Sequence, residues 1–505
     1  MILVIDFGSQ TANLIGRRIR DLGVEATVVT PERSLETIQK LHLEGIILSG
    51  GPMSVYAKHA PTIDKKIYSL GIPILGICYG GQLTAYLLGG TVILGEKKEF
   101  GPATITIQGK SKLFAGLPVR SRVWMSHGDR VESPPAGFRF IAKTENIKAG
   151  AMTNEKKRIY CIQFHPEVQH TEQGSQILKN FLSICGIKQL SYKMNSHIDI
   201  ESLRKHIGPS QAIAAVSGGL DSTVAATLVA RAIGKRLIPV HIDSGLMRAG
   251  TVERVVTYFQ HTLHITPIVI YAKQKFLKAL KGITDPEEKR KRIGKLYVDL
   301  FDNVVKKHTQ VKFLVQGTIY SDVIESHGSK HSDSIKSHHN VGGLPKNMNL
   351  TLIEPIRELY TDQVRALAKQ MHIPADFITE QPHPGPGYAI RIVGEVTKER
   401  LTIVTAADNI IIEEMKRSGW YPKLLHSFAV LTGTKSTAVK GDGRMYGEVV
   451  ALRTIISKDR MTADYAKLPY ALLQTISSRI VNEIPGVSRV VYDITTKPPA
   501  TMEWE

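Results

Sequence analysis

The chain has 505 residues, of which 42% are hydrophobic and 22% are charged, a balance typical of globular proteins. At roughly 150 residues per domain, this length predicts about three domains. No segment approaches the roughly 20 consecutive apolar residues of a membrane-spanning helix, and the first residues, MILVIDFGSQ, indicate a strand rather than a signal peptide. Three cysteines give no disulfide framework in a chain this long, so we expect a cytoplasmic protein with no membrane partner.

The net charge of +19 leaves two interpretations open. A basic surface attracts the phosphate backbone of nucleic acids. It is also compatible with an ordinary solvated surface that carries sites for small phosphorylated substrates. The second interpretation is favoured, because no basic run is interleaved with aromatic residues as in a platform that binds nucleic-acid strands. We therefore expect no nucleic-acid partner.

The first domain is predicted to span residues 1–190. Short apolar runs that indicate buried strands lie at 2–6, 26–30, 45–50 and 72–77, and the segments between them have helical spacing. Strands that alternate with helices predict a parallel α/β sheet. The polar stretch 186–199 is expected to link this domain to the next one.

A second domain is predicted over residues 191–380 and a third, smaller one over residues 381–505. Apolar runs that indicate the strands of the second domain lie at 212–219, 236–245, 266–272 and 312–318. The segment 327–340 is too polar to pack, so we expect a mobile loop over a site. The expected fold class is α/β, with two successive parallel-sheet domains followed by a smaller α+β domain.

Cys78 stands at the end of an apolar run in PILGICYGGQ (73–82). Glycines at 76, 80 and 81 allow a sharp turn from strand to helix that would expose a nucleophile, as in the Gly-x-Ser-x-Gly elbow. At such a place the positive end of the following helix favours a thiolate and can hold an oxyanion. The motif therefore predicts a reactive thiol.

A base and an acid for this thiol are available at His165 and Glu167 in QFHPEV (163–168). Residues two apart on a strand point to the same face, and although Pro166 could kink the chain, the carboxylate lies close enough to orient the imidazole. Cys78, His165 and Glu167 have the roles of a triad for acyl transfer. The alternative is that the cysteine and the histidine are ordinary core residues, and their combination with the glycine turn favours the triad.

These motifs, together with DFGSQ (6–10), LSGGPMSVY (48–56) and MSHGD (125–129), resemble class I glutamine amidotransferase domains. In that family the cysteine attacks the side-chain amide of glutamine and releases ammonia, and water then hydrolyses the glutamyl thioester. The resemblance implies these roles for the triad. It also implies an oxyanion hole formed by amides near Gly51 and Tyr79, and it implies that Gln82 helps to hold the substrate.

A strand, a Ser-Gly-Gly-x-Asp-Ser loop and a helix are predicted in AIAAVSGGLDSTVAATL (212–228). The small residues at 217–219 let successive backbone amides approach an anion, and the start of the helix adds its positive end. Asp221 suits Mg²⁺ held between a carboxylate and phosphate oxygens. The pattern is not a Walker A loop. The alternative of an ordinary glycine turn is disfavoured by the Asp-Ser continuation.

This loop resembles that of the ATP pyrophosphatases, which have the fold of the adenine-nucleotide α-hydrolases, cleave ATP between the α and β phosphates and activate a substrate as its adenylate. The residues that the resemblance assigns to the pyrophosphate end of ATP are Ser217, Gly218, Gly219, Leu220, Asp221, Ser222 and Thr223. It also places HIDSGL (241–246) beside the nucleotide. Asp322 and Glu325, which would share a helical face, become carboxylates of a lid. The implied cofactor is Mg²⁺ bound with ATP, without an organic cofactor.

An ammonia source fused to an adenylating domain implies that an oxygen of the acceptor is activated and replaced by nitrogen. Further motifs at KSHHNVGGLP (336–345), PGPGYAIR (384–391), GDGRMYGEVVALR (441–453) and SRVVYDITTKPPATMEWE (488–505) closely resemble the glutamine-hydrolysing GMP synthase family, and the match runs along essentially the whole chain. The implied enzyme is a carbon–nitrogen ligase of purine biosynthesis. It adenylates the C2 oxygen of xanthosine monophosphate (XMP), and ammonia displaces AMP to give GMP, with pyrophosphate and glutamate as the other products.

In the family that the chain resembles, the third domain forms a homodimer and its last residues enter the XMP pocket. The matching positions here are Arg489, Lys497 and Glu503. Lys497 would neutralise the 5′-phosphate, and Glu503 would accept hydrogen bonds from the purine edge. The alternative for Lys497 is an ordinary loop lysine. The implied partners are glutamine, ATP, XMP and a second copy of the chain.

Five positions depart from the family pattern, namely Ser321 for proline, Lys435 for arginine, His383 for phenylalanine, Tyr388 for leucine and His426 for glutamine. Two other classes of protein also remain open. An RNA-modifying enzyme such as a tRNA thiolase would share the phosphate loop, but it needs a further reactive cysteine and none follows Cys185. A non-catalytic nucleotide sensor would tolerate alkylation of Cys78. Because uncoupled glutamine hydrolysis is wasteful, we also expect ATP and XMP to control the glutaminase through a domain rotation.

Overall fold

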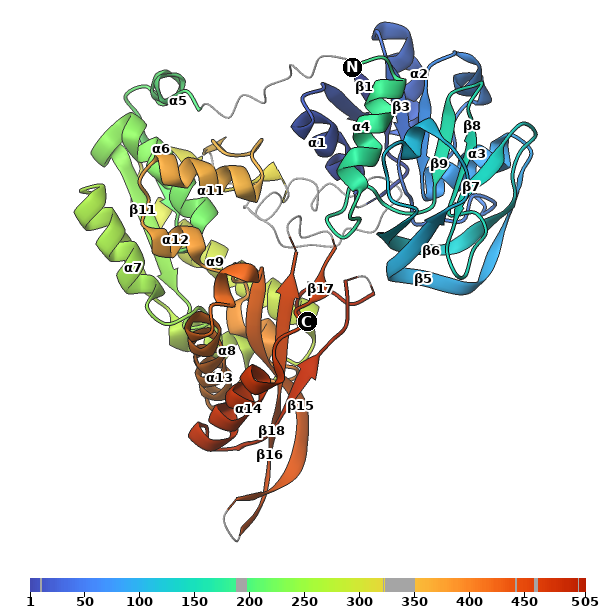
Figure 1. The fold of residues 1–505 in the computed structure, drawn as a ribbon. Coiled ribbons are helices and arrows are strands. Elements are labelled where there is room, and N and C mark those ends of the chain that lie inside the picture. Colours follow the sequence, from blue (N-terminus) through green and yellow to red (C-terminus); the bar gives the residue numbers. More distant parts are fainter. Residues whose placement is uncertain are drawn as a thin grey trace.

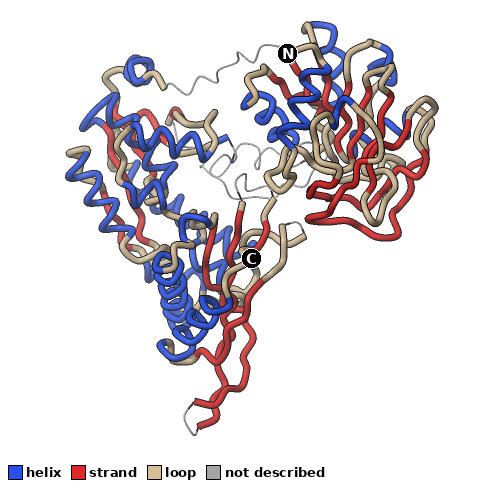
Figure 2. Tube along the Cα trace, in the orientation of Figure 1, coloured by secondary structure: helices blue, strands red, loops and turns tan. Residues whose placement is uncertain are grey.

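The computed structural model describes residues 1–9, 11–187, 198–320, 322, 350–440, 443–457, 462–497 and 499–505. They form three lobes, each built on its own sheet (Figure 1). Helices and strands alternate in two lobes, and long paired strands dominate the third (Figure 2). The predicted loop 327–340, Glu325, Ser321 and most of the predicted linker lie outside the described residues.

The first sheet has nine strands in the order β2-β1-β3-β4-β9-β8-β7-β5-β6. Its parallel part consists of β1 (Ile2–Ile5), β2 (Ala26–Val29), β3 (Gly45–Leu48), β4 (Ile74–Ile77) and β9 (Ile159–Ile162). Its antiparallel part consists of β5 (Thr91–Ile107), β6 (Arg120–Ser133), β7 (Arg139–Lys143) and β8 (Ala151–Asn154). The predicted parallel strands are confirmed. The antiparallel extension was not predicted.

Four helices accompany this sheet, α1 (Ala12–Asp21), α2 (Pro31–Lys40), α3 (Tyr79–Leu87) and α4 (Gly174–Ile184). Apolar residues of α1 and α4 pack on one face of the sheet, and those of α3 pack on the other. The strand β1, with sequence ILVI, is therefore buried along its whole length, as expected for a parallel strand covered on both faces.

The second sheet is entirely parallel and has the order β12-β11-β10-β13-β14. Its strands are β10 (Gln211–Ala215), β11 (Leu237–Asp243), β12 (Ile268–Tyr271), β13 (Val311–Val315) and β14 (Thr351–Ile353). The chain runs outward from β10 to β12 and then returns to place β13 on the other side of β10. Ligands of such doubly wound sheets bind at the carboxyl ends of the strands where the order reverses, which here is between β10 and β13.

Helices cover both faces of the second sheet. They are α5 (Ile200–Ile207), α6 (Leu220–Ile233), α7 (Thr251–Thr257), α8 (Lys273–Leu280), α9 (Pro286–Val305), α11 (Thr361–Gln370) and α12 (Ala375–Thr379). One core joins α6, α7 and α11 to the sheet, whereas α9 packs against the opposite face.

The third sheet contains β15 (His426–Lys440), β16 (Gly443–Ile456), β17 (Asp464–Tyr465) and β18 (Val487–Asp493), with α13 (Lys398–Arg417) and α14 (Tyr470–Glu483) beside it. Its core is continuous with side chains of α8 and α9, so the second and third lobes share one apolar interior. The α+β character predicted for this part is confirmed. Within the described segments, no helix combines the length and the apolar character needed to cross a membrane.

Candidate active sites

Cys78 occupies a strained turn between β4 and α3. Its φ of 52° lies in the left-handed region, which non-glycine residues enter at a cost that is commonly found at functional sites. The neighbouring glycines are required by close packing: a Cβ atom on Gly80 would lie 2.4 Å from the carbonyl oxygen of Leu48, and one on Gly76 would lie 2.8 Å from the backbone of Gly80. The cysteine is thus held at the start of a helix by a turn that no larger residues could form.

His165 and Glu167 follow β9 and lie next to this turn. The imidazole Nδ1 donates a hydrogen bond of 2.7 Å to Oε1 of Glu167, and both side chains are buried. A Cβ atom placed on Gly50 would lie 3.1 Å from Cε1 of His165 and 3.8 Å from Cβ of Cys78. Both side chains therefore lie next to Gly50. The three predicted triad residues are therefore adjacent.

The protonation of His165 is set by these neighbours. Burial alone would lower the pKa of the imidazole, but the charge of Glu167 and hydrogen bonds to Cys78 and Glu167 together raise it well above its usual value. The geometry and charge of the site suit a cysteine nucleophile.

Two further groups reach the sulfur atom of Cys78. The side-chain amide of Gln163 donates to Sγ at 3.5 Å, and the carbonyl oxygen of Ser126 lies 3.6 Å away. The sequence prediction missed Gln163, although it precedes His165 by two residues and so could have been expected on the same face.

The residues predicted to bind glutamine surround the same turn. Gln82 is buried, and its amide nitrogen donates to the carbonyl oxygen of Asp129 at 2.8 Å and to Oε1 of Gln163 at 3.2 Å. Its amide group is thus engaged by protein atoms next to the sulfur. Tyr79 begins α3, where a backbone amide has no partner within the helix. A Cβ atom on Gly51 would lie 3.1 Å from the ring of Tyr79, so the two residues of the predicted oxyanion hole are neighbours.

The loop after β10 lies at the reversal point of the second sheet. Ser217 and Gly219 are exposed, and the hydroxyl groups of Ser217 and Ser222 are 3.0 Å apart. Gly218 has a φ of +88°, and a Cβ atom there would lie 2.4 Å from Cγ2 of Thr251, so only glycine fits. The hydroxyl group of Thr223 donates to the carbonyl oxygen of Gly219 at 2.9 Å. These bonds fix a compact turn whose outer side is open to solvent.

The remaining residues of this region lie at the same edge of the sheet. Leu220 and Asp221 form the first turn of α6. The carboxylate of Asp322, which follows β13, accepts a hydrogen bond of 3.2 Å from the amide of Ile319. A side chain on Gly317 would lie 2.6 Å from the amide nitrogen of Ser222, so the two chain segments are in contact.

Mg²⁺ usually binds proteins through one or two carboxylates and completes its shell with water and substrate phosphates. A single carboxylate at Asp221, next to a loop rich in backbone amides, fits that donor set. The part of the chain that the structure describes contains no group of three or more His, Cys, Asp or Glu side chains placed to hold a metal ion by themselves.

The three residues predicted to contact XMP lie on different parts of the third lobe. Arg489 is exposed on β18. Lys497 is anchored by two backbone hydrogen bonds to Ala463, of 2.8 and 3.0 Å. Glu503 is bound by the guanidinium of Arg391 through two hydrogen bonds of 3.0 Å each. No described contact joins Arg489 to Glu503.

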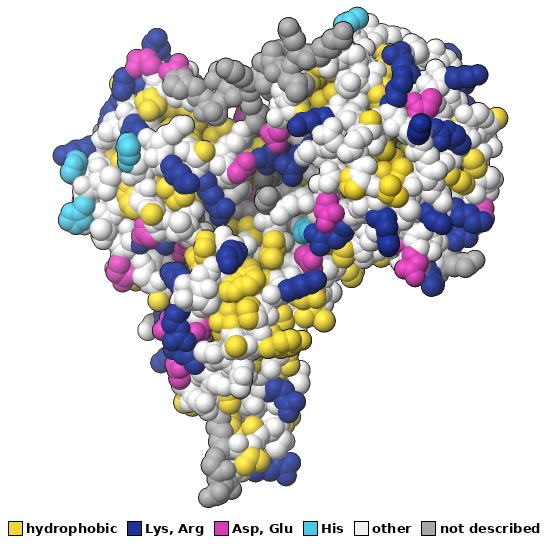
Figure 3. Space-filling view, viewed as in Figure 1, with side chains coloured by type: hydrophobic (Ala, Val, Ile, Leu, Met, Phe, Trp, Pro, Cys, Tyr) yellow, Lys and Arg dark blue, Asp and Glu magenta, His cyan; other side chains and the backbone are white. Residues whose placement is uncertain are grey.

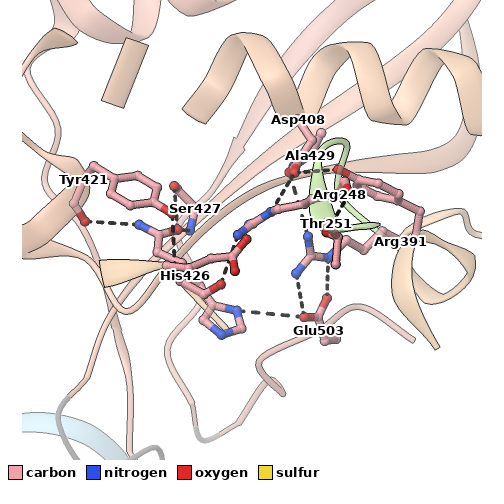
Figure 4. A network of polar contacts seen from close by, with 12 residues as sticks. Arg248, Thr251, Arg391, Asp408, Tyr421, His426, Ser427, Ala429 and Glu503 are labelled. Atoms are coloured by element: carbon pink, nitrogen blue, oxygen red, sulfur yellow. Dashed lines mark hydrogen bonds and ion pairs between the residues drawn. The ribbon is translucent and has the colours of Figure 1, made fainter. Parts of the chain in front are cut away.

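Glu503 belongs to a buried charged network (Figure 4). Its centre is Asp408, which accepts hydrogen bonds from the hydroxyl group of Tyr388 at 2.9 Å and from the amide of Ala429 at 3.2 Å. Arg248, from the second lobe, contacts the same carboxylate at 3.4 Å. The network therefore joins the second lobe to the segment that carries Glu503. The sequence analysis did not predict it, because its members are far apart along the chain.

Three of the departures from the family pattern surround this network. The hydroxyl group of Tyr388 is used by Asp408, as described above. His426 lies 3.8 Å from Glu503. The ring of His383 packs edge-on against Tyr388 at 4.9 Å, and burial together with the charges of Arg391 and Arg248 holds its pKa well below the usual value. The fourth, Lys435, is exposed on β15.

Comparison with known proteins identifies the chain. Residues 3–185 match the family model of class I glutamine amidotransferases, and residues 413–504 match that of the GMP synthase C-terminal domain. The chain is 49% identical over 507 residues to the GMP synthase (glutamine-hydrolysing) of Caldanaerobacter subterraneus subsp. tengcongensis, 50% identical over 512 residues to that of Nitratiruptor sp. and 49% identical over 507 residues to that of Aquifex aeolicus. Each alignment covers 100% of this chain and 99% of the relative.

Such matches over the full length favour the ligase over the tRNA thiolase and the nucleotide sensor, the two other classes that the sequence left open. The chain therefore belongs to the glutamine-hydrolysing GMP synthase family, and its activity is the glutamine-dependent synthesis of GMP.

Proposed function

We propose that Cys78, His165 and Glu167 release ammonia from glutamine. The thiolate of Cys78 attacks the side-chain carbonyl carbon, the amides of Gly51 and Tyr79 hold the resulting oxyanion, and His165 donates a proton to the departing ammonia. His165 then takes a proton from water, which attacks the thioester, so that glutamate is released and the thiolate of Cys78 is restored. The hydrogen bond of 2.7 Å between His165 and Glu167, and the raised pKa of His165, support these roles. Gln82 helps to hold the glutamine substrate, and its hydrogen bond to Gln163 keeps that side chain beside the sulfur.

In the same proposal, residues 217–223 bind the pyrophosphate end of ATP. The position of this loop at the reversal point of a parallel sheet and at the start of α6 supports it. Asp221 would hold Mg²⁺, which neutralises phosphate charge when bound. The C2 oxygen of XMP attacks the α-phosphate, pyrophosphate leaves, and ammonia then displaces AMP to give GMP. Asp322 would belong to a lid over this site, and Glu325, which the resemblance assigns to the same lid, lies outside the described residues.

XMP would be held at the third lobe by Arg489, Lys497 and Glu503. Lys497 is assigned to the 5′-phosphate because an ammonium group suits a phosphate, and Glu503 is assigned to the purine edge. The forked hydrogen bonds from Arg391 fix the direction of the Glu503 carboxylate and leave further lone pairs to accept bonds.

We further propose three domains, over residues 1–190, 191–380 and 381–505, and a homodimer formed through the last. Hydrophobic side chains gather on the third lobe in Figure 3. Tyr470 is 90% exposed on this lobe, and Val491 is also exposed, beside a groove that Leu473 and Val490 line. Exposed apolar surface of this kind marks protein interfaces.

The unpaired state of Cys78, Cys161 and Cys185 supports a reducing, cytoplasmic location.

The observation that carries the glutaminase assignment is the adjacency of Cys78, His165 and Glu167 at a strained glycine turn. It is tested by measuring AMP and GMP formed from XMP and ATP, with either glutamine or ammonium as the nitrogen source. The variant Cys78→Ala is expected to lose glutamine-driven synthesis and to keep ammonium-driven synthesis. Glutamine-driven synthesis that survives in this variant would remove the assignment.

A further inference from the structure

The last residues of the sequence, Glu503 to Glu505, are held by two buried cations that come from different lobes. Lys289 on α9 is 0% exposed, although lysine is almost never fully buried without a partner. Its ammonium group donates to the carbonyl oxygens of Ala389, at 3.2 Å, and Ile392, at 2.6 Å, and forms an ion pair with the carboxylate of Glu505. Arg391, also 0% exposed, binds Glu503.

The two ion pairs connect the same two short stretches of the chain, residues 389–392 and residues 503–505. Arg391 lies between Ala389 and Ile392, so the stretch that Lys289 binds also presents the guanidinium that binds Glu503. Figure 4 shows Arg391 facing Glu503, and the guanidinium stacks on the ring of Phe428, 4.0 Å from its centroid. Lys289 and Arg391 together fix both glutamates of the Glu-Trp-Glu segment.

Further contacts hold both the side chains and the backbone of this segment. The amide of Gly394 donates to the Glu505 carboxylate at 3.3 Å, and the side chain of Arg290 binds the main-chain oxygen of Glu505. The indole nitrogen of Trp504 donates to Asp493 at 2.9 Å. The segment is therefore anchored to α9 of the second lobe as well as to its own lobe.

A buried ammonium is costly to keep. Burial lowers the pKa of Lys289, and only the interactions with Glu505 and other acidic groups oppose this. An apolar side chain of similar size would fill the same space without the desolvation cost, and for that reason a buried ion pair is weak evidence for a stabilising role. We therefore expect the ion pair between Lys289 and Glu505 to fix one arrangement of the tail rather than to stabilise the fold.

We infer that Lys289 and Glu505 are positioning residues for XMP: their ion pair holds the tail in the arrangement that binds the nucleotide. The inference rests on the proposed role of Lys497 and Glu503 in XMP binding. When only a fraction of the molecules have the tail in the arrangement that binds XMP, the apparent affinity for XMP is the intrinsic affinity multiplied by that fraction. Saturating XMP shifts all molecules to the binding arrangement. Loss of the ion pair thus raises KM for XMP and leaves kcat nearly unchanged.

The test measures ammonium-driven GMP synthesis by Lys289→Met, Glu505→Gln, the double variant and wild type. We expect KM for XMP to rise about tenfold in each single variant, the size of effect expected for one charged hydrogen bond, with kcat within about twofold. The double variant should be no worse than the single ones, because residues that act through one contact are not additive. Lys291→Met, at an exposed position two residues along α9, is the matched control and should behave as wild type.

Hydrogen–deuterium exchange of residues 494–505 supplies a readout other than activity. Exchange should be faster in Lys289→Met and should return to the wild-type level when XMP is saturating. A lowered unfolding temperature with unchanged KM and unchanged exchange would mean that the pair only stabilises the fold, and would overturn the inference. Glu505→Gln keeps α9 intact, so the inference stays testable if Lys289→Met does not fold.

The variant Lys497→Met separates this inference from the proposed function. A raised KM for XMP in Lys497→Met, combined with wild-type KM in Lys289→Met and Glu505→Gln, overturns the positioning role alone. A wild-type KM in Lys497→Met overturns the proposed XMP contact of Lys497, and with it the inference.

Discussion

At the scale of single residues, the protonation of His165 depends on Glu167. The carboxylate is buried, and it keeps the pKa of the imidazole well above its usual value against the effect of burial. We expect Glu167→Gln to lower the rate of glutamine hydrolysis about a hundredfold, because a general acid–base group contributes roughly that factor. Ammonium-driven GMP synthesis should be unchanged. Glu172→Gln, at a surface position paired with Arg122, is the control.

The same pair makes stability depend on pH in a definite direction. The pKa of His165 is raised in the folded state, so its contribution to the free energy of unfolding is fully present below the unfolded pKa of about 6.5 and is lost as pH rises through the folded value. Denaturant unfolding at a series of pH values should show this loss in wild type and not in Glu167→Gln. An identical pH profile in the two proteins would contradict the coupling.

The residues that could be predicted from the sequence are those that belong to a short, recognisable motif. The glycine elbow around Cys78 and the two-residue spacing of His165 and Glu167 were sufficient to single out these three residues, and the structure places them next to one another. The pairing of Arg391 with Glu503 could not be predicted in this way, since 112 residues separate them and only the fold brings them together. Gln163 was missed for a different reason: a glutamine has no distinctive chemistry until a sulfur atom is found beside it.

At the scale of elements, the loop between β10 and α6 depends on one backbone conformation. Gly218 has a φ of +88° and no space for a Cβ atom, whereas its neighbour Gly219 has an ordinary φ of −79° and meets only the hydroxyl oxygen of Ser217 at 3.4 Å. We expect Gly218→Ala to destabilise the protein by about 1–3 kcal/mol and to raise KM for ATP. Gly219→Ala should have a much smaller effect on the unfolding temperature. Equal losses of stability in the two variants would show that the loop does not need the left-handed conformation.

Most strands of the parallel sheets were predicted close to their observed positions, because strands buried on both faces are continuous apolar runs. The strand β14 was not predicted: it has only three residues, and two of them are exposed. The strands β5 and β6 were not predicted. Charged residues interrupt both strands, with Glu96 to Glu99 within β5 and Asp129 and Arg130 within β6, so neither shows the apolar run of a buried strand. Their pairing is decided by tertiary contacts rather than by local preference.

At the scale of the whole molecule, helix α1 connects the triad to the second lobe. Nε of Arg18 donates to the main-chain oxygen of Glu167 at 2.8 Å. One residue earlier, Arg17 binds both carboxylate oxygens of Asp362 on α11 at 2.6 Å, and its guanidinium lies 3.9 Å from the centroid of the Tyr360 ring. A movement of α11 relative to the first lobe would therefore pull on α1 and displace the backbone of Glu167.

This contact offers a test of the expected control of the glutaminase by ATP and XMP. In Asp362→Ala, the ratio of glutaminase rates with and without the two nucleotides should fall about two- to thirtyfold, which corresponds to the coupling energies of roughly 0.5–2 kcal/mol that single residues carry. Ammonium-driven synthesis should stay near wild type, since neither nucleotide site is altered. Asp299→Ala, which removes an exposed carboxylate paired only with Lys295 among the described ion pairs, should keep the wild-type ratio. If Asp362→Ala keeps it too, α1 is only a packing element, and the two activities must communicate through another part of the molecule.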